Sequence, residues 1–130
     1  MGAKEILAEL GNIDGCVSAA VFTPTGEALA TYCSGQIDTK NAGVLANNVL
    51  LNAQKASLEM NTGRGSMVHI EAEKAHILVR CLNEGTDPLK SQPGKSHIHL
   101  VVALANDNSI GLAKMRMNAA LEKLAGEFRV

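Results

Sequence analysis

The stretch NAGVLANNVLLNAQKASLEMN, residues 41–61, decides the fold, because it has the length and pattern of a central helix in a small domain. At about 100° per residue, one apolar stripe runs along it, as expected of a helix packed on a core: Ala42, Leu45, Ala46, Val49, Ala53, Ala56 and Met60. A second apolar stripe lies on the opposite side: Val44, Leu51 and Leu58. Since a soluble helix normally turns a polar face to water, we expect another chain to cover this second stripe. The alternative is that a flanking loop of the same chain covers it.

Apolar runs separated by turn residues predict seven further elements around this helix. In the first turn between strands, Pro24 presets the backbone and Gly26 can adopt positive φ, which predicts a hairpin. The second hairpin turns at Glu73 and Lys74. The predicted elements are a helix over Ala3–Leu10, strands over Cys16–Phe22 and Glu27–Cys33, the helix over about Asn41–Asn61, strands over Ser66–Ala72, Ala75–Leu82 and His97–Leu104, and a helix over Ile110–Phe128.

Two hairpins and a fifth strand predict an α+β fold, an α/β sandwich with a five-stranded, mainly antiparallel sheet. The central helix must cross one face of the sheet to connect the hairpins, which leaves the other face for the two terminal helices. At 130 residues the chain fits a single domain, residues 1–130, that buries roughly two-thirds of its unfolded surface.

Composition excludes several classes of function. The net charge is −1 and aromatic residues make up 2% of the chain, so neither a basic surface nor a stacking platform for nucleic acid is expected. No apolar run is long enough to span a membrane, and no secretion signal opens the chain, so we expect a cytoplasmic protein. Cys16, Cys33 and Cys81 lie in apolar strand-like runs and are interpreted as small core residues in a reducing compartment.

The order of elements and a set of turn and cap residues resemble the Roadblock family, which includes dynein light chains and bacterial MglB-like regulators of small GTPases. The similarity covers Ile6 to Leu124, and the residues that carry it are Gly15, Gly26, Asn108, Gly111, Leu112 and Arg116. Each motif alone is common in α/β domains, and the ordered set carries the resemblance. The loop Asn83–Ser96 departs from the family, because it is longer than the family usually has there.

This resemblance implies a profilin-like sheet of strand order 2-1-5-4-3 and a homodimer that joins through the central helices and the third strands. It also implies a non-enzymatic regulator that binds a Ras-like small GTPase and modulates its nucleotide cycle. The alternative within the family is a scaffold or dimerisation module with no effect on GTP hydrolysis.

The helix pattern and the resemblance indicate the same interface. An edge strand over Ser66–Ala72 presents open backbone groups, which another chain can pair. The predicted dimer interface comprises Val44, Leu51, Leu58, Met67 and His69. Polar residues beside the stripe resemble the rim of an interface, and we expect the GTPase to contact Asn47, Asn48, Gln54 and Lys55.

No catalytic residue or cofactor site is predicted. Gly94-Lys95-Ser96 lacks the preceding glycine and the following helix of a phosphate-binding loop. His97 and His99 have a spacing that can chelate zinc or nickel, but the sequence does not identify a third ligand, for which Cys81 and His69 are the candidates. We therefore interpret both histidines as packing residues and predict no metal.

Two arginines are candidates for contact with the nucleotide of a bound GTPase, Arg64 before the edge strand and Arg116 on the last helix. Neither occupies a clear finger position. We therefore expect the protein to act by positioning the switch loops of its partner.

Overall fold

A computed structural model describes residues 2–33, 42–84 and 96–128. Within these ranges the elements are α1 (Ala3–Gly11), β1 (Cys16–Phe22), β2 (Ala28–Cys33), α2 (Ala42–Glu59), β3 (Met67–Glu71), β4 (His76–Asn83), β5 (His97–Leu104) and α3 (Ile110–Phe128). The predicted order is confirmed, and β1, β5 and α3 have the predicted bounds. The predicted helix start at Asn41 and most of the loop Asn83–Ser96 lie outside the described residues.

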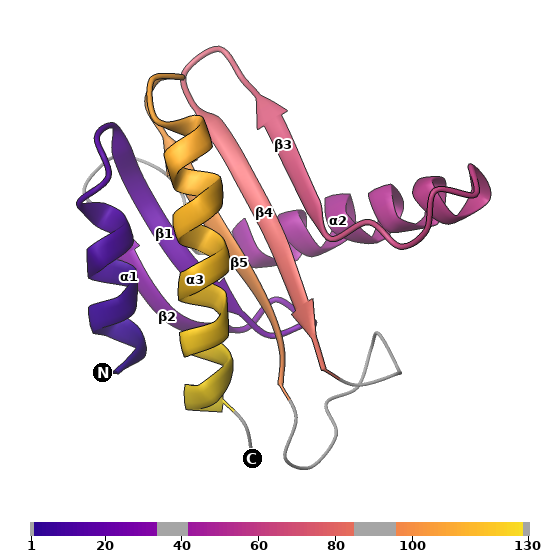
Figure 1. Cartoon of the computed structure of the whole chain (residues 1–130), viewed down its shortest axis with the longest axis horizontal. Helices are drawn as coiled ribbons and strands as arrows, with labels where there is room; N and C mark the ends of the chain where they lie inside the picture. The colour runs from indigo at the N-terminus through magenta and orange to yellow at the C-terminus, as the bar shows by residue number, and fades with distance from the viewer. Residues whose placement is uncertain (1, 34–41, 85–95, 129–130) are drawn as a thin grey trace.

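The described strands form one sheet in the order β2-β1-β5-β4-β3, with each neighbouring pair antiparallel. Figure 1 shows α1 and α3 together on one face and α2 on the other. The predicted α+β class, strand order and layers are therefore confirmed. In the part of the chain that the structure covers, no helix combines the length and apolar character needed to cross a bilayer.

The larger core lies between the sheet and the pair α1 and α3. Its largest fully buried side chains include Ile6, Leu7, Leu78, Leu100, Leu104, Met117 and Leu124. Every residue of the central strand β5 is buried, because helices cover both faces of the sheet there. The cluster of buried side chains that closes this face is apolar.

The smaller core lies between the sheet and the first half of α2, and its buried members are Ala20, Phe22, Ala46, Leu50, Val79 and Val101. The helix begins very close to the turn between β1 and β2. A Cβ atom added at Gly43 would collide with the Phe22 ring and lie 2.7 Å from the Gly26 carbonyl oxygen. Gly26 has a φ of 95°, as its predicted turn requires.

The buried face of α2 differs from the predicted one. It consists of Gly43, Ala46, Asn47, Leu50 and Gln54, and it lies between the two apolar stripes. The predicted core stripe is therefore wrong in most of its members, and Leu45 and Met60 are 62% and 71% exposed. The physical reason is that buried amides find hydrogen-bond partners beneath the helix, which a hydrophobic pattern does not detect.

Candidate functional site

Large apolar side chains are exposed along α2. Val44, Leu51 and Leu58, the predicted second stripe, are 50%, 41% and 57% exposed. Leu45 and Met60 add further apolar surface on another side of the same segment. A concentration of apolar side chains on one exposed element is typical of a contact surface.

The C-terminal part of α2 extends beyond the edge strand β3 (Figure 1). Gln54 is the last buried residue of the helix, and the side chains from Lys55 to Glu59 are exposed or half-buried. Among the described strands, none pairs with the outer side of β3. The end of the helix and the open edge of the sheet therefore form one continuous margin of the molecule.

The two predicted interface residues of β3 have different environments. Met67 is half-buried and packs against the larger core, and its sulfur lies 3.3 Å from a guanidinium nitrogen of Arg80. His69 is exposed, and its Nε2 lies 3.0 Å from Nδ1 of His76 on β4. His69 is thus the more accessible of the two at this edge.

The predicted partner-binding residues divide into two pairs. Asn48 and Lys55 are exposed, as a rim requires. Asn47 and Gln54 are only 4% and 8% exposed and face the sheet, so the prediction that they border an exposed seam is corrected. Their side-chain amides form hydrogen bonds with groups inside the protein.

Asn47 connects three segments of the chain beneath α2. Its Nδ2 donates hydrogen bonds to the carbonyl oxygens of Thr23 and Pro24, at 3.2 and 2.6 Å. Its Oδ1 faces Nδ1 of His99, with which it forms a hydrogen bond. Because an amide oxygen only accepts, His99 must donate from Nδ1, and the lone pair of the neutral ring is at Nε2.

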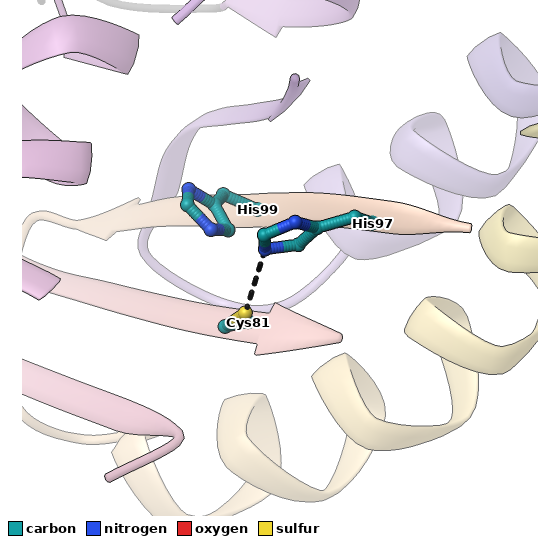
Figure 2. A group of neighbouring side chains, drawn as sticks. All are labelled: Cys81, His97 and His99. Carbon is teal, nitrogen blue, oxygen red and sulfur yellow. Dashed lines mark hydrogen bonds between the residues drawn. The ribbon is translucent and has the colours of Figure 1, made fainter. Parts of the chain in front are cut away.

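Cys81, His97 and His99 lie together at one end of the sheet on the α2 side. In the antiparallel pairing Cys81 is opposite His99, and Asn83 is opposite His97. Nε2 of His97 lies 3.5 Å from the Cys81 sulfur, and the two imidazole centroids are 5.2 Å apart. Figure 2 shows the His97 ring joined to the Cys81 sulfur by a hydrogen bond, with the His99 ring next to it on the same strand. One donor atom from each residue lies within 4.8 Å of the other two.

Burial shifts the protonation equilibria of Cys81 and His99 toward their neutral forms. Burial raises the pKa of the Cys81 thiol to about 11, although the positive charge of Arg64 and a hydrogen bond with Gln54 act in the opposite direction. Burial, together with the smaller effects of the charges of His97 and Arg64, lowers the pKa of His99 to about 4. The His99 ring is therefore neutral near pH 7 and available as a ligand.

The two arginines singled out in the sequence lie on different faces. Arg64 lines an open pocket of about 240 Å³ together with Gln54 and Cys81. Arg116 is exposed on α3 and lines a groove of about 390 Å³ between α1 and α3. Of these two arginines, only Arg64 lies on the α2 side of the sheet.

Sequence reasoning interpreted Cys81 as a small core residue and also named it, with His69, as a candidate third ligand. The Cys81 side chain is half-buried beside His97, whereas His69 pairs with His76. The signal was the pair of histidines two positions apart, but the third member depends on the register between β4 and β5. That register cannot be obtained from the sequence, because a long loop connects these strands.

No family model matches the sequence, and comparison with curated proteins yields no match. Solved structures, however, share the fold. A structure described as MglB with a tetrameric arrangement superposes with a TM-score of 0.77 at 18% identity, over 96% of this chain and 86% of its own. A Roadblock/LC7 domain from Streptomyces avermitilis gives a TM-score of 0.74 at 12% identity, over 93% and 92%.

Profilin II from Acanthamoeba castellanii is a more distant neighbour, with a TM-score of 0.58 at 14% identity, over 96% of this chain and 94% of its own. This similarity bears out the profilin-like description of the sheet. The resemblance inferred from turn and cap residues is likewise confirmed at the level of the fold. The chain has the fold shared by MglB and Roadblock/LC7 domains.

Proposed function

We propose that this protein is a non-enzymatic, homodimeric regulator that binds a Ras-like small GTPase and modulates its nucleotide cycle. The observation that carries the proposal is the exposed apolar surface of α2, which continues past the open edge of β3. The fold shared with MglB supports the same function, because the Roadblock family that the sequence resembles binds or organises such GTPases.

The proposed dimer has a two-fold axis beside β3. Pairing of two β3 edges would continue the sheet into the second protomer and satisfy backbone groups at both edges. The projecting end of each α2 would then lie over the partner, with Val44, Leu51 and Leu58 in the helix seam. Full burial of one such side chain contributes about 1.5–3 kcal/mol, so covering six half-exposed ones contributes several kcal/mol.

The GTPase is proposed to dock on the paired helices beside this seam. Asn48 and Lys55 are exposed there and form the polar rim that remains after Asn47 and Gln54 are assigned to the interior. An apolar centre with a polar margin is a common composition of transient interfaces. The two copies lie near the axis, so one bound GTPase could block the second site.

The dimer is tested by charge insertion in the seam. Leu51→Asp should convert a dimer into a folded monomer, because an uncompensated charge in an apolar contact costs several kcal/mol. Asn52→Asp is the matched control, since it adds the same charge at an exposed position of the same helix. Sedimentation or light scattering measures the mass. A wild-type monomer at micromolar concentration would refute the dimer.

The docking surface is tested with the Ras-like GTPase of the source organism. Asn48→Glu combined with Lys55→Glu should abolish binding and return GTP hydrolysis to its unassisted rate, while the mass of the dimer stays unchanged. Lys123→Glu on α3 is the control for charge reversal on the opposite face. If only the control variant loses binding, the docking face is the terminal-helix side.

The same experiment separates the two functions of the Roadblock family. A regulator changes the rate of GTP hydrolysis or nucleotide release when it is mixed with its partner. Binding without any change in these rates would support the scaffold function, and the absence of binding to any Ras-like GTPase would contradict both forms of the proposal.

A further inference from the structure

The cluster of Cys81, His97 and His99 has the dimensions of a zinc site. Tetrahedral zinc binds thiolate sulfur at about 2.3 Å and imidazole nitrogen at about 2.0–2.1 Å, so sulfur and nitrogen on one ion lie about 3.6 Å apart. The Cys81 sulfur and Nε2 of His97 are 3.5 Å apart. Because all three donor atoms lie within 4.8 Å of one another, the remaining distances need to shorten by at most about 1–1.5 Å.

The hydrogen bond from His99 to Asn47 orients the third donor. A histidine that binds a metal usually donates its other ring N–H to a carbonyl or carboxylate oxygen, which fixes the tautomer and the direction of the ring. Asn47 Oδ1 provides this acceptor, and two backbone carbonyls hold the amide in place. Figure 2 shows a second ring nitrogen of His99 on the side toward Cys81.

We propose that Cys81, His97 and His99 bind one Zn²⁺ ion through the thiolate sulfur and the two Nε2 atoms, with solvent as the fourth ligand. Thiolate and imidazole favour zinc over Mg²⁺ and Ca²⁺, which prefer oxygen ligands. The proposal is independent of the GTPase partner, and it reverses the interpretation of the two histidines as packing residues.

The surroundings leave room for the fourth ligand. Cys81 lines the open pocket of about 240 Å³ that also contains Gln54 and Arg64. Water or hydroxide can reach the metal from this side, and the positive charge of Arg64 favours an anionic ligand there. Three protein ligands and one open position are the arrangement of zinc sites that exchange a ligand.

Binding displaces protons and involves no oxidation. The Cys81 thiol loses its proton to solvent as the sulfur–zinc bond forms, and each imidazole binds through a ring-nitrogen lone pair, with any proton on that nitrogen likewise lost to solvent. A bound metal deprotonates a coordinating thiol even when burial favours the protonated form. Metal affinity should therefore increase with pH.

The first test uses Co²⁺ as a spectroscopic substitute for zinc, with reduced protein freed of metal by a chelator. The wild type should bind one equivalent and show the visible absorption of tetrahedral cobalt together with a thiolate-to-cobalt charge-transfer band. One equivalent of Zn²⁺ should remove both signals. Absence of the charge-transfer band at stoichiometric cobalt would overturn the proposal without any variant.

The second test locates the ligands. Cys81→Ser should lose the charge-transfer band, and His97→Gln should weaken Zn²⁺ binding by at least about tenfold. His69→Gln is the matched control, because its imidazole is paired with His76 on the exposed edge of the same sheet. If the metal remains in Cys81→Ser with an unchanged affinity, or is lost in His69→Gln, the ligands lie elsewhere.

The third test measures stability. Zn²⁺ that binds the native state raises the Tm by mass action, and the rise should disappear in His97→Gln. Mg²⁺ at the same concentration should have no effect. An unchanged Tm with saturating Zn²⁺ would contradict binding to the folded protein.

Discussion

The two faces of the sheet are built differently. On the side of α1 and α3, apolar side chains fill the space, and the buried helical residues of α3 are all alanine, leucine or methionine. On the side of α2, two amides and two imidazoles are buried with the apolar residues, and the last turns of the helix extend beyond the sheet. The core on the first face is apolar. The core on the second face also contains buried polar side chains, and the helix that covers it carries exposed apolar side chains.

This difference indicates that the face covered by α1 and α3 mainly contributes stability, whereas the face covered by α2 carries the groups suited to binding. A face closed by dispersion and the hydrophobic effect tolerates few changes in its interior. The α2 face contains specific hydrogen bonds, titratable groups and uncovered apolar side chains, which are the components of binding sites. Four predictions test this contrast, in the order of their expected effects on the free energy of unfolding.

The largest effect is expected for Leu124→Ala in the closed face. Leu124 is completely buried on α3, so its truncation should lower the free energy of unfolding by about 3 kcal/mol, within the usual range of 2–5. Urea unfolding in the Leu51→Asp background, which is expected to be monomeric, measures the loss with and without the second substitution. A loss below about 1 kcal/mol would contradict the description of this face as tightly closed.

The second effect is a pH dependence that belongs to the α2 face. The pKa of His99 is about 4 in the folded protein and 6.5 in an ordinary environment, so between these values only the unfolded chain binds the proton. The free energy of unfolding should therefore fall as the pH decreases from 6.5 to 4, by up to about 3 kcal/mol. Cys81, His97 and Arg64 are the titratable or charged groups around the ring.

The measurement is urea unfolding at several pH values in the presence of a chelator. His99→Gln should remove most of the slope in this window, whereas His69→Gln on the exposed edge should keep it. An identical slope in wild type and His99→Gln would show that the buried imidazole is not the source.

A third prediction concerns the close contact at the start of α2. Gly43→Ala places a methyl group against the Phe22 ring and 2.7 Å from the Gly26 carbonyl oxygen, which should cost about 1–3 kcal/mol. Gly111→Ala on α3 is the matched control, because its Cβ meets no atom within 4 Å. That variant should gain about 0.5–1 kcal/mol from helix propensity. Thermal unfolding of both variants distinguishes the steric cost at Gly43 from the gain in helix propensity that alanine provides.

The smallest effect is expected for Leu45→Ala. Leu45 is 62% exposed on α2, so its truncation should change the stability of the monomer by less than about 0.5 kcal/mol. The comparison with Leu124→Ala uses the same chemical change on the two faces. A similar loss for both variants would mean that Leu45 is covered, as the hydrophobic pattern of the helix had predicted.

The sequence was sufficient for the elements and the layers, because apolar alternation, turn glycines and helix length depend on local geometry. The strand order was available only through the resemblance to the Roadblock family. The orientation of α2 was predicted incorrectly, because Asn47 and Gln54 are buried by hydrogen bonds with distant residues. The position of Cys81 beside His97 follows from strand register, which has no local signature in the sequence.

The three hydrogen bonds of Asn47 have a consequence for how α2 settles on the sheet. Gly43, Ala46 and Leu50 share the buried face of the helix with Asn47, so packing already opposes a shift of the helix along the strands. A shift by one turn would leave the Asn47 amide and His99 buried without each other, at a cost of about 1–3 kcal/mol for each group. The hydrogen bonds of Asn47 therefore favour one position of the helix along the sheet. That position determines how far α2 extends past β3.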